Sequence, residues 1–289
     1  MIPPEIIKQI RLIEIKTKKI VNNLFGGEYQ SAFKGAGIEF SEVRKYVPGD
    51  DIRGIDWNVT ARAGNPYIKK FNEERELTVI IMIDVSGSQY YGTGEMLKSD
   101  LIIQIASILS FSAIKNNDKV GLILFSDKIE KYIPAQKGKT HTLRVIREMI
   151  NYKGNHEYSD LNNALEHSLK VLKRKSIIFL LSDFWAYGYQ ENMKRVNKKH
   201  DLINIHLSDP SEKKMFPYGM LKLEDAETRK QYWIDINEKN IKSISRKYDV
   251  KSSNLNKFCK KNNIDLIKIE NNDNYIDPLI NFFNSRMNK

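Results

Sequence analysis

The chain has 289 residues, of which 41% are hydrophobic and 29% charged, so it can bury a sizeable core and is not globally disordered. Its formal net charge of +11 is spread along the sequence and forms no focused basic stripe, which does not favour a specific nucleic-acid site. The single cysteine, Cys259, excludes an intramolecular disulfide framework and a cysteine-built zinc site, and it favours a reducing compartment.

Apolar runs in the sequence are short. The longest, residues 77–83 and 177–181, fall well below the roughly 20 residues that a membrane span needs, so they predict buried strands and no membrane span. Charged residues interrupt the first 16 positions, which is not typical of a signal peptide. We therefore expect a cytoplasmic protein.

The first expected domain covers residues 1–76. Isoleucines on one face predict a helix over residues 4–24, which Gly26 and Gly27 end. A small β-rich annex is expected over residues 38–76, with a turn at residues 48–51. Within it, residues 59–63 and 67–71 are predicted strands on either side of Gly64.

The second expected domain covers residues 77–289, where apolar strands alternate with amphipathic helices. Strands are predicted over residues 77–83, 120–125, 176–181, 202–207 and 264–269, with a returning hairpin strand over 128–133. Helices are predicted over residues 96–115, 140–151, 160–173, 189–198, 253–262 and 275–287. A second hairpin, 221–223 with 232–236, is an insertion near residues 215–240. This alternation predicts an α/β fold with a doubly wound, mostly parallel sheet.

Polar residues follow two of the predicted core strands, at the edge of the sheet where such folds bind ligands. Together with the loop before the helix at 160, they offer two carboxylates and three hydroxyls: Asp84, Ser86, Ser88, Ser159 and Asp183. These hard oxygen ligands suit Mg²⁺ or Mn²⁺ better than zinc. A plainer interpretation stays open, since an aspartate followed by two serines also makes a turn and a helix cap.

The spacing resembles the metal-ion-dependent adhesion site of the von Willebrand factor A domain, which has Asp-x-Ser-x-Ser after its first strand. The resemblance implies that Ser86 and Ser88 ligate the ion directly, while Asp84 and Asp183 hold it, often through water. Ser159 stands where that family usually has threonine. It keeps the hydroxyl but loses the methyl group that fixes the rotamer.

A longer pattern narrows the resemblance. Residues 35–40, 44–53, 55–58 and 60–62 resemble the signature of the domain-of-unknown-function 58 family (DUF58), bacterial proteins with a von Willebrand factor A-like domain. The resemblance runs from about residue 30 to the end of the chain. It implies a MoxR-type AAA+ ATPase as the partner.

Charged and aromatic residues dominate this signature: Arg44, Asp50, Asp51, Arg53, Asp56, Trp57 and Arg62. Two interpretations stay open. Arginine and carboxylate side chains can form an internal network that seats the annex on the sheet. Alternatively, the same residues form a partner-docking face.

Catalytic patterns do not accompany the metal-ligand candidates. A nucleophile elbow needs glycine two residues before and after the serine, whereas Ser86 has Asp84 and Ser88 there. An Asp-x-Asp phosphatase would need a second carboxylate in place of Ser86. We therefore expect a non-enzymatic, metal-dependent interaction module that binds an acidic residue of a partner protein. The alternative is a Mg²⁺-dependent hydrolase of a phosphorylated substrate at the same site; a nucleic-acid-associated factor has only the net charge in its favour.

Overall fold

The computed structural model describes residues 11–14, 21, 39–72, 76–90, 92, 96–152, 158–213, 219–224, 231–271 and 274–287. It divides into two compact units: residues 33–76 form the annex, and residues 1–32 with 77–289 form the main unit. The helix predicted over residues 4–24 lies outside the described residues except at 11–14 and 21, which are helical. The division of the sequence at residue 76 stays a prediction.

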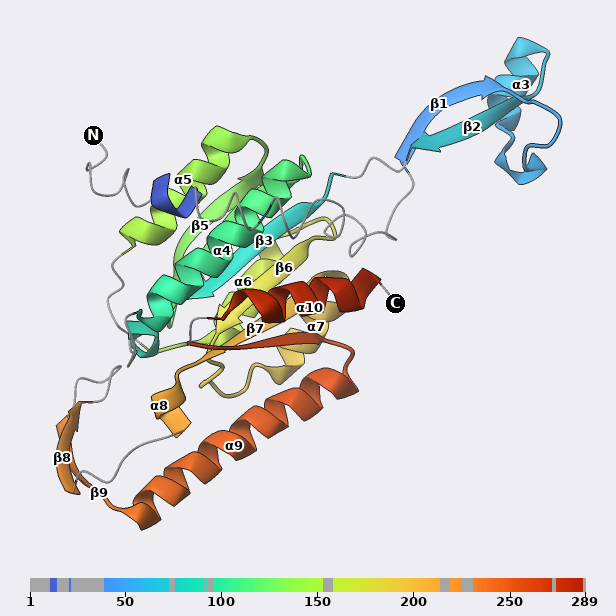
Figure 1. Ribbon diagram of the computed structural model, residues 1–289. Coiled ribbons are helices and arrows are strands. Elements are labelled where there is room, and N and C mark those ends of the chain that lie inside the picture. Colours follow the sequence, from blue (N-terminus) through green and yellow to red (C-terminus); the bar gives the residue numbers. More distant parts are fainter. Residues whose placement is uncertain are drawn as a thin grey trace. The chain divides into compact units, whose positions relative to one another are not determined.

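The main unit is built on a sheet of six strands among the described residues, in the order β10-β7-β6-β3-β4-β5 (Figure 1). Five of them are parallel: β3 (Thr78–Asp84), β4 (Lys119–Phe125), β6 (Ile177–Ser182), β7 (Asp201–Ser208) and β10 (Asp265–Glu270). Strand β5 (Ile129–Gln136) returns antiparallel to β4 at one edge, with irregular register and with the exposed Pro134. The predicted α/β fold with a doubly wound, mostly parallel sheet is confirmed.

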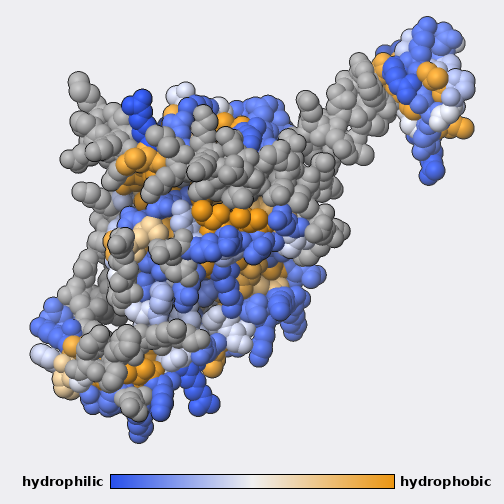
Figure 2. Space-filling view, viewed as in Figure 1, coloured by the Kyte–Doolittle hydropathy of each residue, from blue (hydrophilic) through white to orange (hydrophobic). Residues whose placement is uncertain are grey.

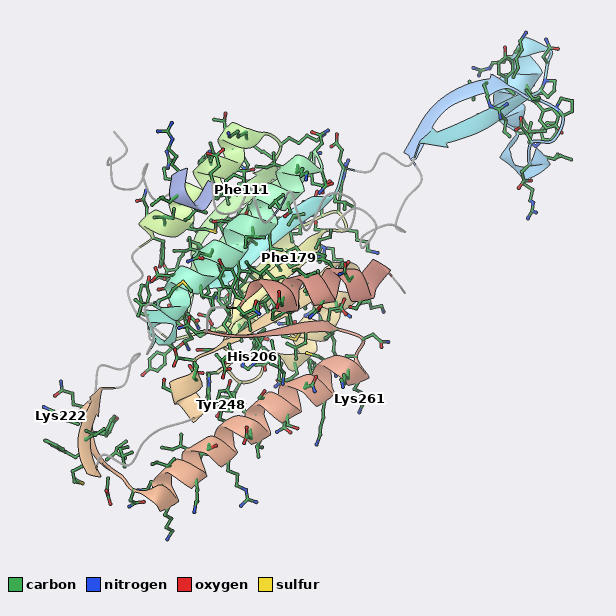
Figure 3. The ribbon with its side chains drawn as sticks, viewed as in Figure 1. Phe111, Phe179, His206, Lys222, Tyr248 and Lys261 are labelled. Carbon is green, nitrogen blue, oxygen red and sulfur yellow. The ribbon has the colours of Figure 1, made fainter. Side chains whose placement is uncertain are left out.

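Helices cover both faces of this sheet because its strands are apolar on both sides. Ile80 and Met82 of β3 belong to a core shared with α6 (Leu161–Val171), α7 (Gln190–Lys199) and α9 (Glu238–Lys261). The alternate residues of β3, Val79 and Ile81, are also fully buried and point to the other face, which α4 (Lys98–Lys115) and α5 (Lys139–Asn151) cover. Helix α10 (Ile276–Met287) packs against β10. Figure 3 shows Phe179 of β6 within the sheet between these layers.

Helix α9 is much longer than the predicted helix over residues 253–262. Its first half is largely exposed, and the apolar residues there, Ile241, Ile244 and Tyr248, form only a sparse stripe among charged and polar side chains. The side chain of Asn237 starts the helix by accepting a hydrogen bond from the backbone N–H of Asn240 at 2.9 Å. Hydrophilic residues dominate the visible side of α9 in Figure 2.

The predicted hairpin insertion is present. Strands β8 (Gly219–Glu224) and β9 (Gln231–Ile236) pair antiparallel, with Leu221 opposite Ile234. Large side chains such as Met220 and Trp233 are exposed on it. A short helix, α8 (Pro210–Lys213), precedes the hairpin in the sequence.

The annex contains a two-stranded antiparallel sheet of β1 (Glu39–Lys45) and β2 (Tyr67–Asn72), joined through the 3₁₀-helix η1 (Ile52–Gly54) and the helix α3 (Trp57–Ala63). The predicted strand over residues 67–71 is confirmed, but the one over 59–63 is wrong because those residues lie in α3. The β-branched Val59 and Thr60 favoured a strand. Capping decides otherwise: the side chain of Asp56 accepts hydrogen bonds from the N–H groups of Asn58 and Val59.

None of the helices in the described ranges combines the length and the apolar character that crossing a bilayer requires.

Candidate functional site

The carboxyl ends of β3 and β6 bring two aspartates together. These strands are parallel neighbours in register, so Asp84 at the end of β3 and Asp183 directly after β6 reach the same edge of the sheet. Both residues are buried, with exposed fractions of 1% and 3%. Two carboxylates thus share a poorly hydrated site.

Three serines hold the carboxylate of Asp84. The hydroxyl groups of Ser182 and Ser159 both donate to Oδ2, at 2.7 and 2.8 Å, and the backbone N–H of Ser86 donates to Oδ1 at 3.1 Å. Burial, followed by repulsion from Asp183, nevertheless raises the pKa of Asp84 to about 6. The donors therefore offset only part of the cost of keeping this carboxylate ionised.

Ser86 and Ser88 connect the two carboxylates: Ser86 contacts Asp84, and Ser88 contacts Asp183. Their hydroxyl oxygens are 3.3 Å apart, and Ser88 accepts a hydrogen bond from Nε2 of Gln89 at 3.1 Å. The hydroxyl of Ser88 also hydrogen-bonds Asp183. The structure therefore brings all five predicted ligands into one cluster: Asp84, Ser86, Ser88, Ser159 and Asp183.

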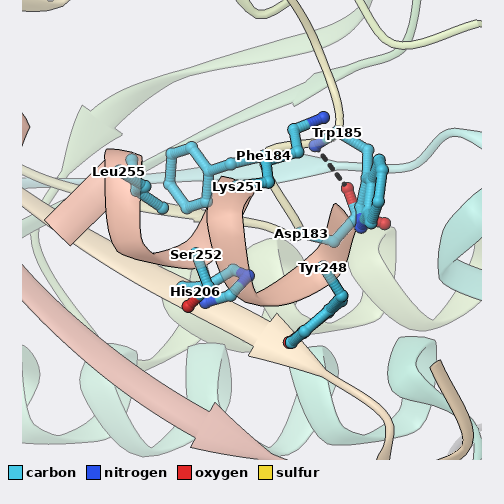
Figure 4. Close-up of a pocket in the computed structure, with 8 residues that line it drawn as sticks. All are labelled: Asp183, Phe184, Trp185, His206, Tyr248, Lys251, Ser252 and Leu255. Carbon is cyan, nitrogen blue, oxygen red and sulfur yellow. Dashed lines mark hydrogen bonds between the residues drawn. The ribbon is translucent and has the colours of Figure 1, made fainter. Parts of the chain in front are cut away.

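A sharp turn after β6 orients Asp183. Phe184 has a φ of 56°, which is rare for a bulky residue, and its backbone N–H donates to the hydroxyl of Ser182 at 2.9 Å. The backbone N–H of Trp185 donates back to Oδ1 of Asp183 at 3.1 Å, as Figure 4 shows. The turn leaves the other oxygen, Oδ2, to bind a cation.

That cation is Lys98, which the sequence analysis missed. Its side chain is 1% exposed, and its Nζ lies 3.2 Å from Oδ2 of Asp183 and 2.6 Å from Oε1 of Glu212. Burial alone would lower the pKa of Lys98, but the two carboxylates outweigh it and raise the pKa, so the side chain stays an ammonium. Burial also raises the pKa of Asp183, but Lys98 first and then the hydrogen bond from Ser88 bring it below its usual value.

Lys98, Glu212 and Ser182 were not predicted as site residues, and only Lys98 had a sequence signal, which was weak. Lys98 is on the same helical face as Leu101 and Ile105, three and seven residues away, so the periodicity of α4 places it on the buried side. Glu212 in α8 and Ser182 had no comparable signal, since their roles depend on contacts with Lys98 and Asp84 across 114 and 98 residues.

The donor set fits a hard divalent cation. When ionised, the carboxylates of Asp84, Asp183 and Glu212 and the ammonium of Lys98 have a net charge of −2, which one divalent ion would balance. Hydroxyl and carboxylate oxygens are the ligands that Mg²⁺ and Mn²⁺ favour. In the described parts of the chain no three His, Cys, Asp or Glu residues cluster closely enough to hold a metal, so binding here would depend on the serine hydroxyls.

A pocket adjoins Asp183 on the side of α9 (Figure 4). Lys251 of α9 places its Nζ 4.0 Å from the centre of the Trp185 ring. His206 of β7 stacks on Tyr248 of α9 with ring centres 6.5 Å apart, and Figure 3 shows these two residues next to each other. Burial lowers the pKa of His206 to about 4, so its imidazole is neutral near pH 7.

The annex divides the signature residues into two groups. Arg44 donates two hydrogen bonds to Asp50, each of 2.7 Å, and Asp51 and Asp56 cap η1 and α3. These four residues have partners inside the annex. The other three are exposed: 68% of Trp57 and 93% of the Arg53 side chain are accessible, and Arg62 is also exposed, although Arg53 pairs with Asp51 at 3.4 Å.

Relatives of this chain by sequence include two uncharacterized bacterial proteins. An uncharacterized protein of Mycobacterium tuberculosis is 27% identical over 229 residues, which cover 78% of this chain and 72% of that protein. YeaD of Bacillus subtilis, also uncharacterized, is 24% identical over 109 residues, or 38% of this chain and 25% of that protein.

Matches to solved structures have low sequence identity. An aerotolerance-related membrane protein from Bacteroides fragilis superimposes with a TM-score of 0.50 and 14% identity, covering 73% of this chain and 98% of that one. The VWA domain of SpRpn10 reaches a TM-score of 0.41 and 13% identity, with 72% and 95% covered. The family model described as "Protein of unknown function DUF58" matches residues 42–253, most of the chain, and the protein belongs to that family.

Proposed function

We propose that this protein is a non-enzymatic interaction module that binds an acidic residue of a partner through Mg²⁺ or Mn²⁺. The ion would be held by Asp84, Ser86, Ser88, Ser159 and Asp183. One observation carries the proposal: two buried carboxylates meet at one edge of the sheet, with serine hydroxyls beside them. Together with Lys98 and Glu212, the ionised groups of the site have a net charge of −2.

Each residue has a distinct part in this arrangement. Asp84 and Asp183 supply the negative charge, and Ser159 and Ser182 orient the Asp84 carboxylate through hydrogen bonds to its Oδ2. Ser86 and Ser88 offer neutral oxygens, which add no charge of their own. A bound divalent ion would supply the positive charge that attracts a carboxylate of the partner.

The groups around the site favour binding over hydrolysis. Asp160, the nearest further carboxylate in the sequence, caps α6 by accepting a hydrogen bond from the N–H of Asn163 at 2.9 Å. His206 in the adjoining pocket has a pKa of about 4, and such a group is a weak general base near pH 7. The Mg²⁺-dependent hydrolase therefore remains the less supported alternative.

The partner we propose is a MoxR-type AAA+ ATPase, which follows from the family resemblance, and the cytoplasmic location we propose follows from the sequence, with its single cysteine. The exposed signature residues Arg53, Trp57 and Arg62 offer a second surface for such a partner. This second surface matters if the metal site proves not to mediate the contact.

Metal titration followed by capture of the partner tests the proposal. The purified chain should bind Mn²⁺ or Mg²⁺ and gain thermal stability from it, whereas Asp84→Asn should do neither. Asp235→Asn, the same change at an exposed position of β9, is the matched control. Chelation should weaken capture of the ATPase. Phosphatase turnover that disappears in Asp183→Asn would overturn the interaction module in favour of a hydrolase.

A further inference from the structure

Lys98 occupies an unfavourable position for a lysine. It is the first residue of the 18-residue helix α4, where the helix dipole disfavours a positive charge, and it is almost completely buried. An ammonium placed there is stable only because Asp183 and Glu212 lie within hydrogen-bond distance. Packing or helix formation alone therefore does not account for a lysine here.

We infer that Lys98 is a built-in competitor of the divalent ion for Asp183, and that Glu212 controls how strongly it competes. This inference rests on the metal site proposed above. Because both oxygens of Asp183 already accept a hydrogen bond, from Trp185 and from Lys98, an ion must share this carboxylate with the ammonium. The ammonium and an ion on the same carboxylate would repel each other as like charges, so Lys98 weakens the affinity for the ion.

Glu212 gives the ammonium a second place to bind. Its contact with Lys98, at 2.6 Å, is shorter than the 3.2 Å contact of Lys98 with Asp183. The flexible stem of lysine lets the ammonium stay with Glu212 while Asp183 turns to an ion. Glu212 thus favours the metal-bound arrangement by retaining Lys98.

The position of Glu212 is fixed by its neighbours. Its other oxygen accepts a hydrogen bond from the backbone N–H of Asp209 at 3.2 Å. Asn271 in turn donates to Asp209 at 3.1 Å and to the backbone oxygen of Met96 at 2.8 Å, just before α4. The affinity of the site for the ion is therefore coupled to the segment after β7, which lies outside the ligand cluster.

Calorimetric titration of the full chain with Mn²⁺ tests the competition between Lys98 and the ion directly. Lys98→Met should tighten Mn²⁺ binding roughly tenfold or more. Even with the dielectric constant of water, the repulsion between a divalent ion and a unit charge a few ångströms away corresponds to about that factor in affinity. Glu212→Gln should weaken binding, because Lys98 then depends on Asp183 alone. In the double variant the effect of Glu212→Gln should largely vanish, since Glu212 acts through Lys98.

Controls separate the charge of Lys98 from general effects. Lys115→Met removes the same charge from the exposed far end of α4, about 25 Å along the helix, and should leave the affinity within about twofold. Lys98→Arg keeps the charge and should not tighten binding. If Lys98→Met folds poorly, Lys98→Arg and Glu212→Gln still test the inference, and thermal melting in chelator and in Mn²⁺ reports folding.

The outcomes distinguish this inference from the proposed function. If the unmodified chain binds Mn²⁺, Asp84→Asn abolishes binding and Lys98→Met binds no better than the unmodified chain, Lys98 is structural and only this inference fails. If Lys98→Met binds and the unmodified chain does not, the competition holds and the proposed metal-dependent function fails. If neither binds, both are overturned.

Discussion

Asp84 should destabilise the metal-free protein at neutral pH, and Asp84→Asn tests this. Burial raises its pKa from the ordinary 3.8 to about 6, a difference that corresponds to at most about 3 kcal/mol of unfolding free energy above pH 6. Asparagine has nearly the same shape and no charge. The variant should therefore be more stable than the unmodified chain in chelator at pH 7.5, although it no longer binds the ion.

The dependence on pH gives the same prediction a second check. The folded chain holds a proton on Asp84 between pH 6 and pH 3.8 that the unfolded chain releases, so Asp84 destabilises the fold above pH 6 and this effect disappears as the pH falls toward 4. The advantage of Asp84→Asn should shrink accordingly. Urea unfolding in chelator at pH 7.5 and at pH 5 measures both effects. A variant that is less stable than the unmodified chain at pH 7.5 would refute the reasoning.

Three further predictions concern single groups. Ser159→Ala removes a hydrogen bond to Asp84 and should weaken Mn²⁺ binding, whereas Ser159→Thr should keep the affinity of the unmodified chain. Equal affinities of the alanine variant and the unmodified chain in a titration would show that the hydroxyl has no role in binding. Burial lowers the pKa of His200 to about 4, so this histidine should lower the stability of the fold as the pH falls from 6.5 toward 4, opposite in sign to the contribution of Asp84; denaturation of His200→Asn should lack this loss. Asp56→Ala removes the cap of α3 and should destabilise this helix by about 1 kcal/mol, measured as faster amide exchange in the full chain. Trp57→Ala, at an exposed position, should change the stability of α3 by less than about 0.5 kcal/mol. A loss of partner binding in Trp57→Ala alone would identify a docking face.

The core of the fold was accessible from the sequence because its elements are strongly patterned. Strands such as β3 and β6 are continuous apolar runs, and helices such as α6 repeat leucines at helical spacing. Helix α3 was not predicted from the sequence, since its β-branched residues favoured a strand and outweighed the capping signal of Asp56. The exposed start of α9 has only a sparse apolar stripe, Ile241, Ile244 and Tyr248, which the prediction did not use.

The predicted ligand cluster depended on topology rather than on local pattern. Once β3 and β6 are recognised as parallel strands, Asp84 and Asp183 are expected at one edge, and the structure places them there. The lysine and glutamate beside them were not predictable in the same way. Lys98 meets Glu212 across 114 residues, and a lysine at the start of a helix is ordinarily a solvated side chain.

The antiparallel return of β5 also affects how the protein behaves at high concentration. An edge strand exposes unpaired backbone groups that could pair with another molecule and begin aggregation. Pro134 cannot donate a backbone hydrogen bond, and the irregular register beside it interrupts the regular ladder that a second strand would need. Lys131 adds an exposed charge along the same edge. This border of the sheet is therefore poorly suited to growth by the addition of a further strand.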